Sequence, residues 1–83
     1  MRTIWKFRIQ NKTELVMPRG ARILHLALQN NEPHIWAEVE STASFERRFF
    51  HIVGTGFDID SFDVYIGTYQ LPPFVWHVYE VKR

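Results

Sequence analysis

The stretch ARILHLALQNNEPHIWAEVE, residues 21–40, decides the fold class. Residues 34–40 alternate in hydrophobicity with the period of two that is typical of β-strands, and residues 21–29 form a strand-length run with apolar residues at odd and even positions. Asn30-Asn31-Glu32-Pro33 separates the two runs with residues that favour turns. The stretch therefore predicts a β-hairpin with its connection at residues 30–33.

The two arms of this hairpin differ in how many of their faces are apolar. Residues 21–29 are apolar on both faces, so we expect this arm to be a central strand, covered on both sides. In residues 34–40 one face carries Ile35, Ala37 and Val39, which we expect to point into the core. Trp36 falls on the opposite, polar face, which makes it a candidate for contact with a partner.

Similar short runs occupy the rest of the chain and predict an all-β fold. Gly54-Thr55-Gly56 is expected to end a strand in a turn with a positive φ angle, and Pro72-Pro73 to form a wide turn at a sheet edge. We expect one all-β domain over residues 1–83, an antiparallel sheet of six to seven short strands in a small sandwich or open barrel. At most one helical turn is expected, near residues 58–63. The further predicted strands are 3–9, 15–17, 45–53, 64–71 and 74–81.

Composition limits the class of protein. The chain has 83 residues, of which 46% are hydrophobic and 16% aromatic, enough to bury a core. It has no cysteine, which excludes disulfides, a thiolate nucleophile and cysteine-based zinc sites, and favours a reducing cytoplasm. The opening residues MRTIWKFRIQNK do not resemble a signal peptide. We expect a cytoplasmic protein.

Charge is unevenly distributed along the chain although the net charge is only +1. Residues 1–31 carry six basic residues and one acidic residue, whereas residues 32–46 carry four acidic residues and no basic one. One interpretation is that basic and acidic strands pair across a sheet. The other is a dipolar surface that orients a partner.

The residue types needed for catalysis or metal binding do not occur in the required patterns. The four histidines stand at positions 25, 34, 51 and 77, too far apart in sequence for a local ligand pair. The acidic residues at positions 58, 60 and 63 lack the glycine and glutamate of a calcium loop. Every Asp and Glu lies in a polar run or on the charged side of an alternating strand. We therefore predict no catalytic residue, no metal, no cofactor and no enzymatic activity.

Aromatic residues beside basic ones are the remaining functional hint. Trp, Tyr and Arg dominate the binding energy of protein interfaces, and aromatic–basic surfaces also bind single-stranded nucleic acids. Alternation would place Trp5 and Phe7 on the face opposite the basic residues next to them, which weakens the nucleic-acid interpretation. The candidate partner-binding residues are Trp36, Arg47, Arg48, Lys6 and Arg8.

The chain also resembles a family of small proteins of unknown function encoded by bacteriophages and prophages. The matching segments are IWKF (4–7), MPRGA (17–21), IL (23–24), QN (29–30), PHIWA (33–37), RF (48–49), GTG (54–56), YIGTYQ (65–70) and VWHVYE (75–80). Pro72-Pro73 and Phe57 depart from the family pattern, which has a glycine-containing link and a histidine there. The resemblance implies a protein at work in the bacterial host cell.

Together these observations lead to a function hypothesis. The resemblance implies a protein that binds another protein stoichiometrically and inhibits or modulates a host factor or a defence complex such as CRISPR–Cas. A nucleic-acid-binding accessory protein remains an alternative, as does a homo-oligomeric structural or assembly protein, possibly a homodimer. No membrane partner is expected, because the longest apolar runs are far too short to span a bilayer.

Overall fold

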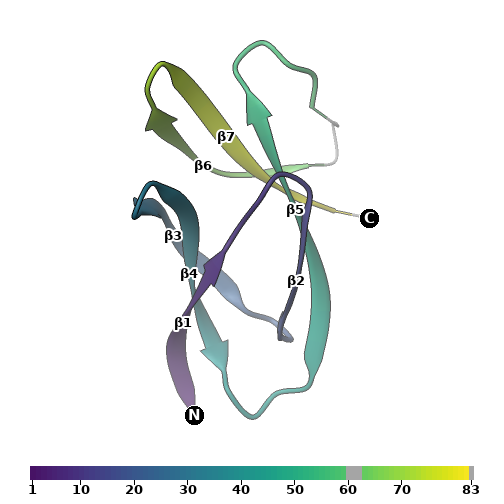
Figure 1. Ribbon diagram of the computed structural model, residues 1–83. Coiled ribbons are helices and arrows are strands. Elements are labelled where there is room, and N and C mark those ends of the chain that lie inside the picture. Colours follow the sequence, from purple (N-terminus) through teal and green to yellow (C-terminus); the bar gives the residue numbers. More distant parts are fainter. Residues whose placement is uncertain (60–62, 83) are drawn as a thin grey trace.

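A computed structural model describes residues 1–59 and 63–82 and confirms the all-β class (Figure 1). Alternation of half-buried and exposed side chains along most strands is the physical basis of this fold. The seven strands are β1 (Arg2–Arg8), β2 (Thr13–Pro18), β3 (Arg22–Gln29), β4 (Glu32–Glu40), β5 (Phe45–Gly54), β6 (Val64–Leu71) and β7 (Phe74–Val81).

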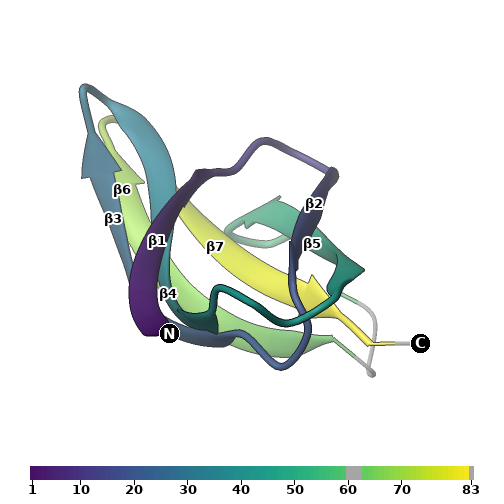
Figure 2. The same ribbon diagram turned by 90° about the horizontal axis from the view of Figure 1, so that it is seen from below.

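The strands form two antiparallel sheets, as in a small sandwich. Sheet A has the order β1-β4-β3 and sheet B the order β2-β5-β7-β6. On one side the sheets meet where β3 lies against β6, which Figure 2 shows. A side chain at Gly67 of β6 would place its Cβ 3.0 Å from Leu26 of β3, so the absence of a side chain there permits this close approach. On the other side, β1 and β2 diverge from the turn that joins them.

Strand β3 is an edge strand, so the prediction that residues 21–29 form a central strand was wrong. The central strand of sheet A is β4, which pairs with β1 on one side and β3 on the other. The register shift between Ile23 and His25 explains why this run reads as apolar on both faces: it places Ile23 and Leu26 on the same inner face, where Leu26 packs over Gly67 of β6, and leaves Leu24 43% exposed.

The connections between strands are tighter than the sequence suggested. The hairpin between β3 and β4 turns on Asn30 and Asn31 alone, with φ angles of 53° and 61°, as a two-residue turn of type I′ requires. Pro72-Pro73 is a two-residue connection with a cis peptide bond, since Leu71 pairs with Phe74; the expected wide turn was wrong. Gly56 has a φ of 93°, which confirms the predicted turn after β5.

No helix occurs among residues 1–59 and 63–82, so none there could cross a membrane. The predicted helical turn near 58–63 is not found at residues 58, 59 and 63, and residues 60–62 lie outside the described part of the chain.

The core lies between the inner faces of the two sheets. Ile35, Ala37 and Val39 of β4 are fully or almost fully buried, which confirms the predicted inward face. Sheet B contributes Met17, Phe50 and Val78 to the core, one from each of three strands. The half-buried residues packed around this cluster are Trp5, Phe7, Leu15, Ile23, Leu26, Ile52, Ile66 and Tyr69.

Candidate functional site

The five predicted partner-binding residues lie on three different surfaces. Lys6, Arg8 and Trp36 share the outer face of sheet A, because Lys6 pairs with Trp36 and Arg8 with His34 across β1 and β4. Arg47 lies on the outer face of sheet B, where its side chain is 76% exposed. Arg48 points to the inner face of the same sheet. The structure therefore brings three of the five together and separates the other two.

The outer face of sheet A is a ladder of ion pairs. Glu38 of the central strand accepts from Arg2 of β1 and from Arg22 of β3, the latter at 3.1 Å. Arg8 Nε lies 3.0 Å from a carboxylate oxygen of Glu32. The N-terminal ammonium and Thr42 hydrogen-bond to Glu40 and lower the pKa of its carboxyl to about 2. These contacts confirm that the basic and acidic segments pair across a sheet.

Trp36 is half-buried at the centre of this face. Its ring centre lies 5.9 Å from that of His25 and 6.1 Å from that of His34. Lys6 crosses the sheet from β1 to hydrogen-bond the side chain of Gln29 on β3. The face thus combines aromatic rings and cations, but acidic residues flank His34 and Trp36 on the same face of β4, with Glu32 before them and Glu38 and Glu40 after them.

Arg48 belongs to the inner face of sheet B and forms a buried ion pair. Its Nε and Nη2 donate to the two carboxylate oxygens of Glu80 at 2.6 and 2.8 Å, and its Nη1 donates to the carbonyl of Ala21. The side chains of Arg48 and Glu80 are only 13% and 6% exposed. Arg48 therefore ties β5 to β7 and to the start of β3, and its guanidinium is occupied within the chain.

The charges of this pair depend on one another. Burial alone would raise the pKa of Glu80, but the hydrogen bonds and charge of Arg48, helped by Lys82, outweigh burial and hold that pKa below its usual value. The hydrogen bond to Glu80 raises the pKa of Arg48. The expectation that every Asp and Glu lies in a polar run or on a charged strand face was wrong for Glu80.

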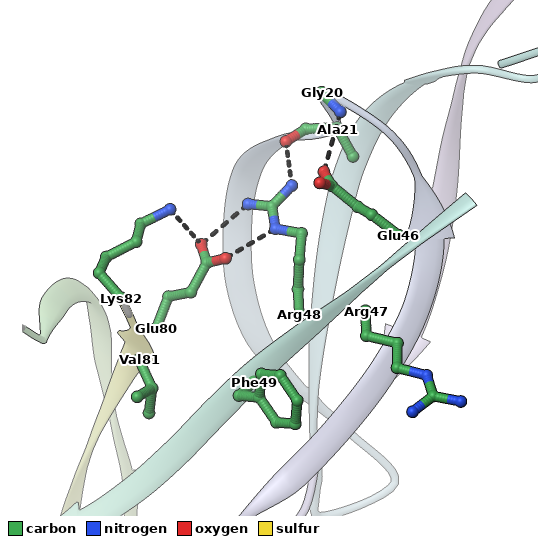
Figure 3. A pocket seen from close by; sticks show the side chains of 9 residues that line it. All are labelled: Gly20, Ala21, Glu46, Arg47, Arg48, Phe49, Glu80, Val81 and Lys82. Atoms are coloured by element: carbon green, nitrogen blue, oxygen red, sulfur yellow. Dashed lines mark hydrogen bonds and ion pairs between the residues drawn. The ribbon is translucent and has the colours of Figure 1, made fainter. Parts of the chain in front are cut away.

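A pocket of about 460 Å³ opens beside the pair, and Figure 3 shows it from close by. Arg48, Glu80 and Lys82 converge on one another, while Arg47 points away from them. Glu46 accepts from the backbone amide of Gly20 at 3.0 Å. Because the carboxylates here already have partners within the chain, we interpret this pocket as structural.

A second surface, which sequence reasoning found only in part, lies on the outer face of sheet B. We call Val16, Phe45, Arg47 and Phe49 the β2–β5 patch. Arg47 lies directly opposite Val16, with Phe45 and Phe49 two positions away on either side along β5. Val16, Phe45 and Phe49 are 58%, 56% and 37% exposed. Alternation along residues 45–53 would have found the patch, since Arg48 and Phe50 face the core and the odd-numbered residues must face outward.

Further along this outer face, hydroxyl groups hold His77 in place. Thr55 lies 2.8 Å from Nε2 and Thr68 lies 2.9 Å from Nδ1, and Tyr65 hydrogen-bonds to Thr68 in turn. The arrangement fixes the imidazole ring on an exposed surface. Over residues 1–59 and 63–82, no three His, Asp or Glu side chains gather in a way that could hold a metal ion.

Comparison with known proteins adds a family but no activity. No curated protein and no solved structure matches this chain. A family described as "Domain of unknown function (DUF7352)" matches residues 1–83, the whole chain. The chain therefore belongs to the DUF7352 family, whose function is unknown.

Proposed function

We propose that this protein acts by stoichiometric binding to another protein, with the β2–β5 patch as its contact surface. The observation that carries the proposal is the exposure of Val16, Phe45 and Phe49 side by side around Arg47. The partner would present an apolar surface with an acidic group positioned to meet Arg47.

The composition of the patch supports this assignment. Arg is enriched among the residues that dominate interface energies, and aromatic side chains bury a large area at low entropic cost. Contiguous exposed apolar residues on a sheet face are also the usual sign of an interaction site. Glu14 is the nearest acid, with its carboxylate 3.5 Å from Arg47 Nε, and 44% of its side chain is exposed. A partner carboxylate could therefore compete for Arg47.

The biological setting rests on the resemblance to phage and prophage proteins. Small proteins of mobile genetic elements commonly act by occupying the surface of a host enzyme or of a defence complex such as CRISPR–Cas. In that setting the partner is a bacterial protein, and the effect of binding is to inhibit or modulate it.

The test is an affinity capture from bacterial lysate with three forms of the protein. The wild type should enrich one host protein in nuclease-treated and untreated lysate alike. Phe45→Ala/Arg47→Glu should lose that protein, whereas Arg22→Glu, an equal charge reversal at an exposed residue of sheet A, should retain it. Retention by the first variant, or loss by both, would exclude the patch. Arg48 is left unchanged, because reversing its charge would bury two like charges, at positions 48 and 80, beside each other and destabilise the fold.

Nucleic-acid binding is the second candidate, favoured by the placement of Lys6 and Arg8 beside Trp36 on one sheet face. Single-strand binders use such aromatic and basic surfaces. The acidic side chains of Glu32, Glu38 and Glu40 on the central strand oppose it, since they repel phosphate. Affinity for an oligonucleotide that falls steeply with salt and is lost in Lys6→Glu would favour this function over protein binding.

A further inference from the structure

Strand β1 has an unused hydrogen-bonding edge. Within the described residues it pairs with β4 alone. The amide of Ile9 donates to the carbonyl of Pro33, and the carbonyl of Met1 accepts from the amide of Ser41. Because backbone groups alternate between the two edges of a strand, the odd-numbered residues of β1 bond to β4. The N–H and C=O groups of Arg2, Ile4, Lys6 and Arg8 point to the free edge.

The other sheet edges carry features that discourage strand pairing, and β1 does not. A register shift interrupts β3 between Ile23 and His25, and another interrupts β6 between Tyr65 and Gly67. Strand β2 ends in Pro18. By contrast, β1 runs in an uninterrupted register over all seven residues and contains no proline or glycine. Bulges, prolines and charged side chains are the devices that protect edges, and β1 has only charge.

The side chains of β1 define what kind of strand could be added. On the inner face, Trp5 and Phe7 remain half-buried although they pack against the core, so an added strand could cover them with apolar residues. On the outer face β1 exposes Arg2, Ile4, Lys6 and Arg8 and carries no acid of its own. Arg2 and Arg8 pair with Glu38 and Glu32 of β4, so an acidic residue on an added strand would share these cations, as Arg2 and Arg22 share Glu38. An added strand that fits both faces alternates apolar residues, facing inward, with acidic residues, facing outward.

A second copy of this chain does not fit that description. If two β1 strands paired antiparallel about a two-fold axis, residues 2, 4, 6 and 8 of each would face one another. Every such register that pairs about five or more residues of each strand places basic residues opposite one another: Arg2 opposite Lys6, Arg2 opposite Arg8 or Lys6 opposite Lys6. Like charges directly opposite are destabilising. The charge of β1 therefore selects against self-pairing and in favour of an acidic strand.

We propose that the free edge of β1 accepts an extended segment of another protein, added antiparallel as a fourth strand of sheet A, in which apolar and acidic residues alternate. Main-chain hydrogen bonds to Ile4 and Lys6 provide the binding, and the basic row of β1 provides the selectivity. This site is separate from the β2–β5 patch and does not depend on it.

A capped octapeptide that alternates valine and glutamate is the probe, with binding followed by fluorescence polarisation. In the proposed pairing, the peptide's glutamates lie opposite the outward residues of β1, so their amides bond to the free edge. N-methylation of the glutamate amides should weaken binding at least tenfold, whereas N-methylation of the valine amides should change it less than threefold. Equal effects of the two modifications, or no binding of the unmodified peptide, would overturn the proposal.

Variants of the protein test the same edge. Ile4→Pro removes one free-edge N–H without touching the bonds to β4 and should weaken binding at least tenfold, while Ile4→Val should not. Lys6→Glu should weaken binding and Arg47→Glu, on the other sheet, should not. Circular dichroism checks that Ile4→Pro is folded. If this variant does not fold, the comparison of the N-methylated peptides tests the proposal without it. One further result would assign this edge to a second copy of the chain instead. It is a homodimer, detected by sedimentation, that Lys6→Glu strengthens and that the peptide does not displace.

Discussion

Two ion-paired regions of this molecule use the same chemical groups in different surroundings. On the outer face of sheet A, Arg2 and Arg22 share Glu38, and their side chains are 73% and 71% exposed. On the inner face of sheet B, Arg48 and Glu80 form a bidentate pair almost out of reach of water. Water screens the first set and leaves the second unscreened. Burial, more than the number of ion pairs, therefore decides where charge matters to stability.

The largest effect is expected from breaking the buried pair. Arg48→Met leaves the buried carboxylate of Glu80 with only the half-exposed Lys82, 3.5 Å away, as a cation, which should destabilise the fold by about 3 kcal/mol. Adding Glu80→Leu should recover most of that loss, since an apolar pair needs no compensation. Urea unfolding measures both, with Arg47→Met as the exposed neighbouring control. A loss below about 1 kcal/mol in Arg48→Met would contradict the contrast between the two regions.

The second-largest effect is expected from acid, which should weaken the buried ion pair. The pKa of Glu80 is lower in the folded chain than in the unfolded chain, so its ionised form stabilises the fold above the unfolded pKa of about 4.3. That contribution is lost as the pH falls from about 5 through the folded pKa. Urea midpoints between pH 7 and pH 3 should therefore fall more steeply in the wild type than in Arg48→Met/Glu80→Leu. Parallel curves for the two proteins would argue against the assignment.

The exposed ladder should respond weakly. Glu38→Gln removes the shared carboxylate of Arg2 and Arg22, and we expect a loss of about 0.5–1 kcal/mol, because solvent-exposed pairs contribute little. The loss should shrink in about 0.5 M salt, which screens exposed charges. A loss as large as that of Arg48→Met would mean that the ladder is not an exposed surface network.

The smallest change in stability is expected on the β2–β5 patch. Arg47→Glu alters an exposed side chain whose ion pair with Glu14 is long, at 3.5 Å, so the free energy of unfolding should move by no more than about 0.5 kcal/mol. Binding of the captured partner should nevertheless fall at least tenfold. Thermal unfolding and a titration with that partner separate the two effects. A destabilised variant would place Arg47 in the fold rather than in an interface.

Local patterns in the sequence were sufficient to predict most strands. The last two predicted strands, 64–71 and 74–81, have the bounds of β6 and β7, because Pro72-Pro73 marks their separation sharply. The failure at β3 had a different origin: the register shift between Ile23 and His25 changes the phase of alternation, so a strand with one inner face reads as apolar on both. The pairing of β1 with β4, between residues 26 to 38 positions apart, is equally invisible to local pattern.

The candidate site was predicted residue by residue but not as one surface. Arg47 and Arg48 are adjacent in sequence, so alternation along a strand necessarily sends them to opposite faces. The buried pair had a readable signal: Arg48 is in phase with Phe50, and Glu80 is in phase with Val78. Two opposite charges in phase with core residues on different strands indicate a buried ion pair.

The order in which the chain contributes strands to the two sheets has a consequence for how it folds. All strands of sheet A are present once the chain reaches residue 40, because the pair of this sheet that lies furthest along the chain is Arg2 with Glu40. Strand β2, which comes before two of the strands in sheet A, must wait for β5, as Thr13 pairs with Phe50. Such distant pairings lose loop entropy before they gain contacts, so we expect folding in the range of about milliseconds to seconds. During synthesis on the ribosome, β2 would remain exposed after sheet A had formed, open to chaperones or to early capture by a partner.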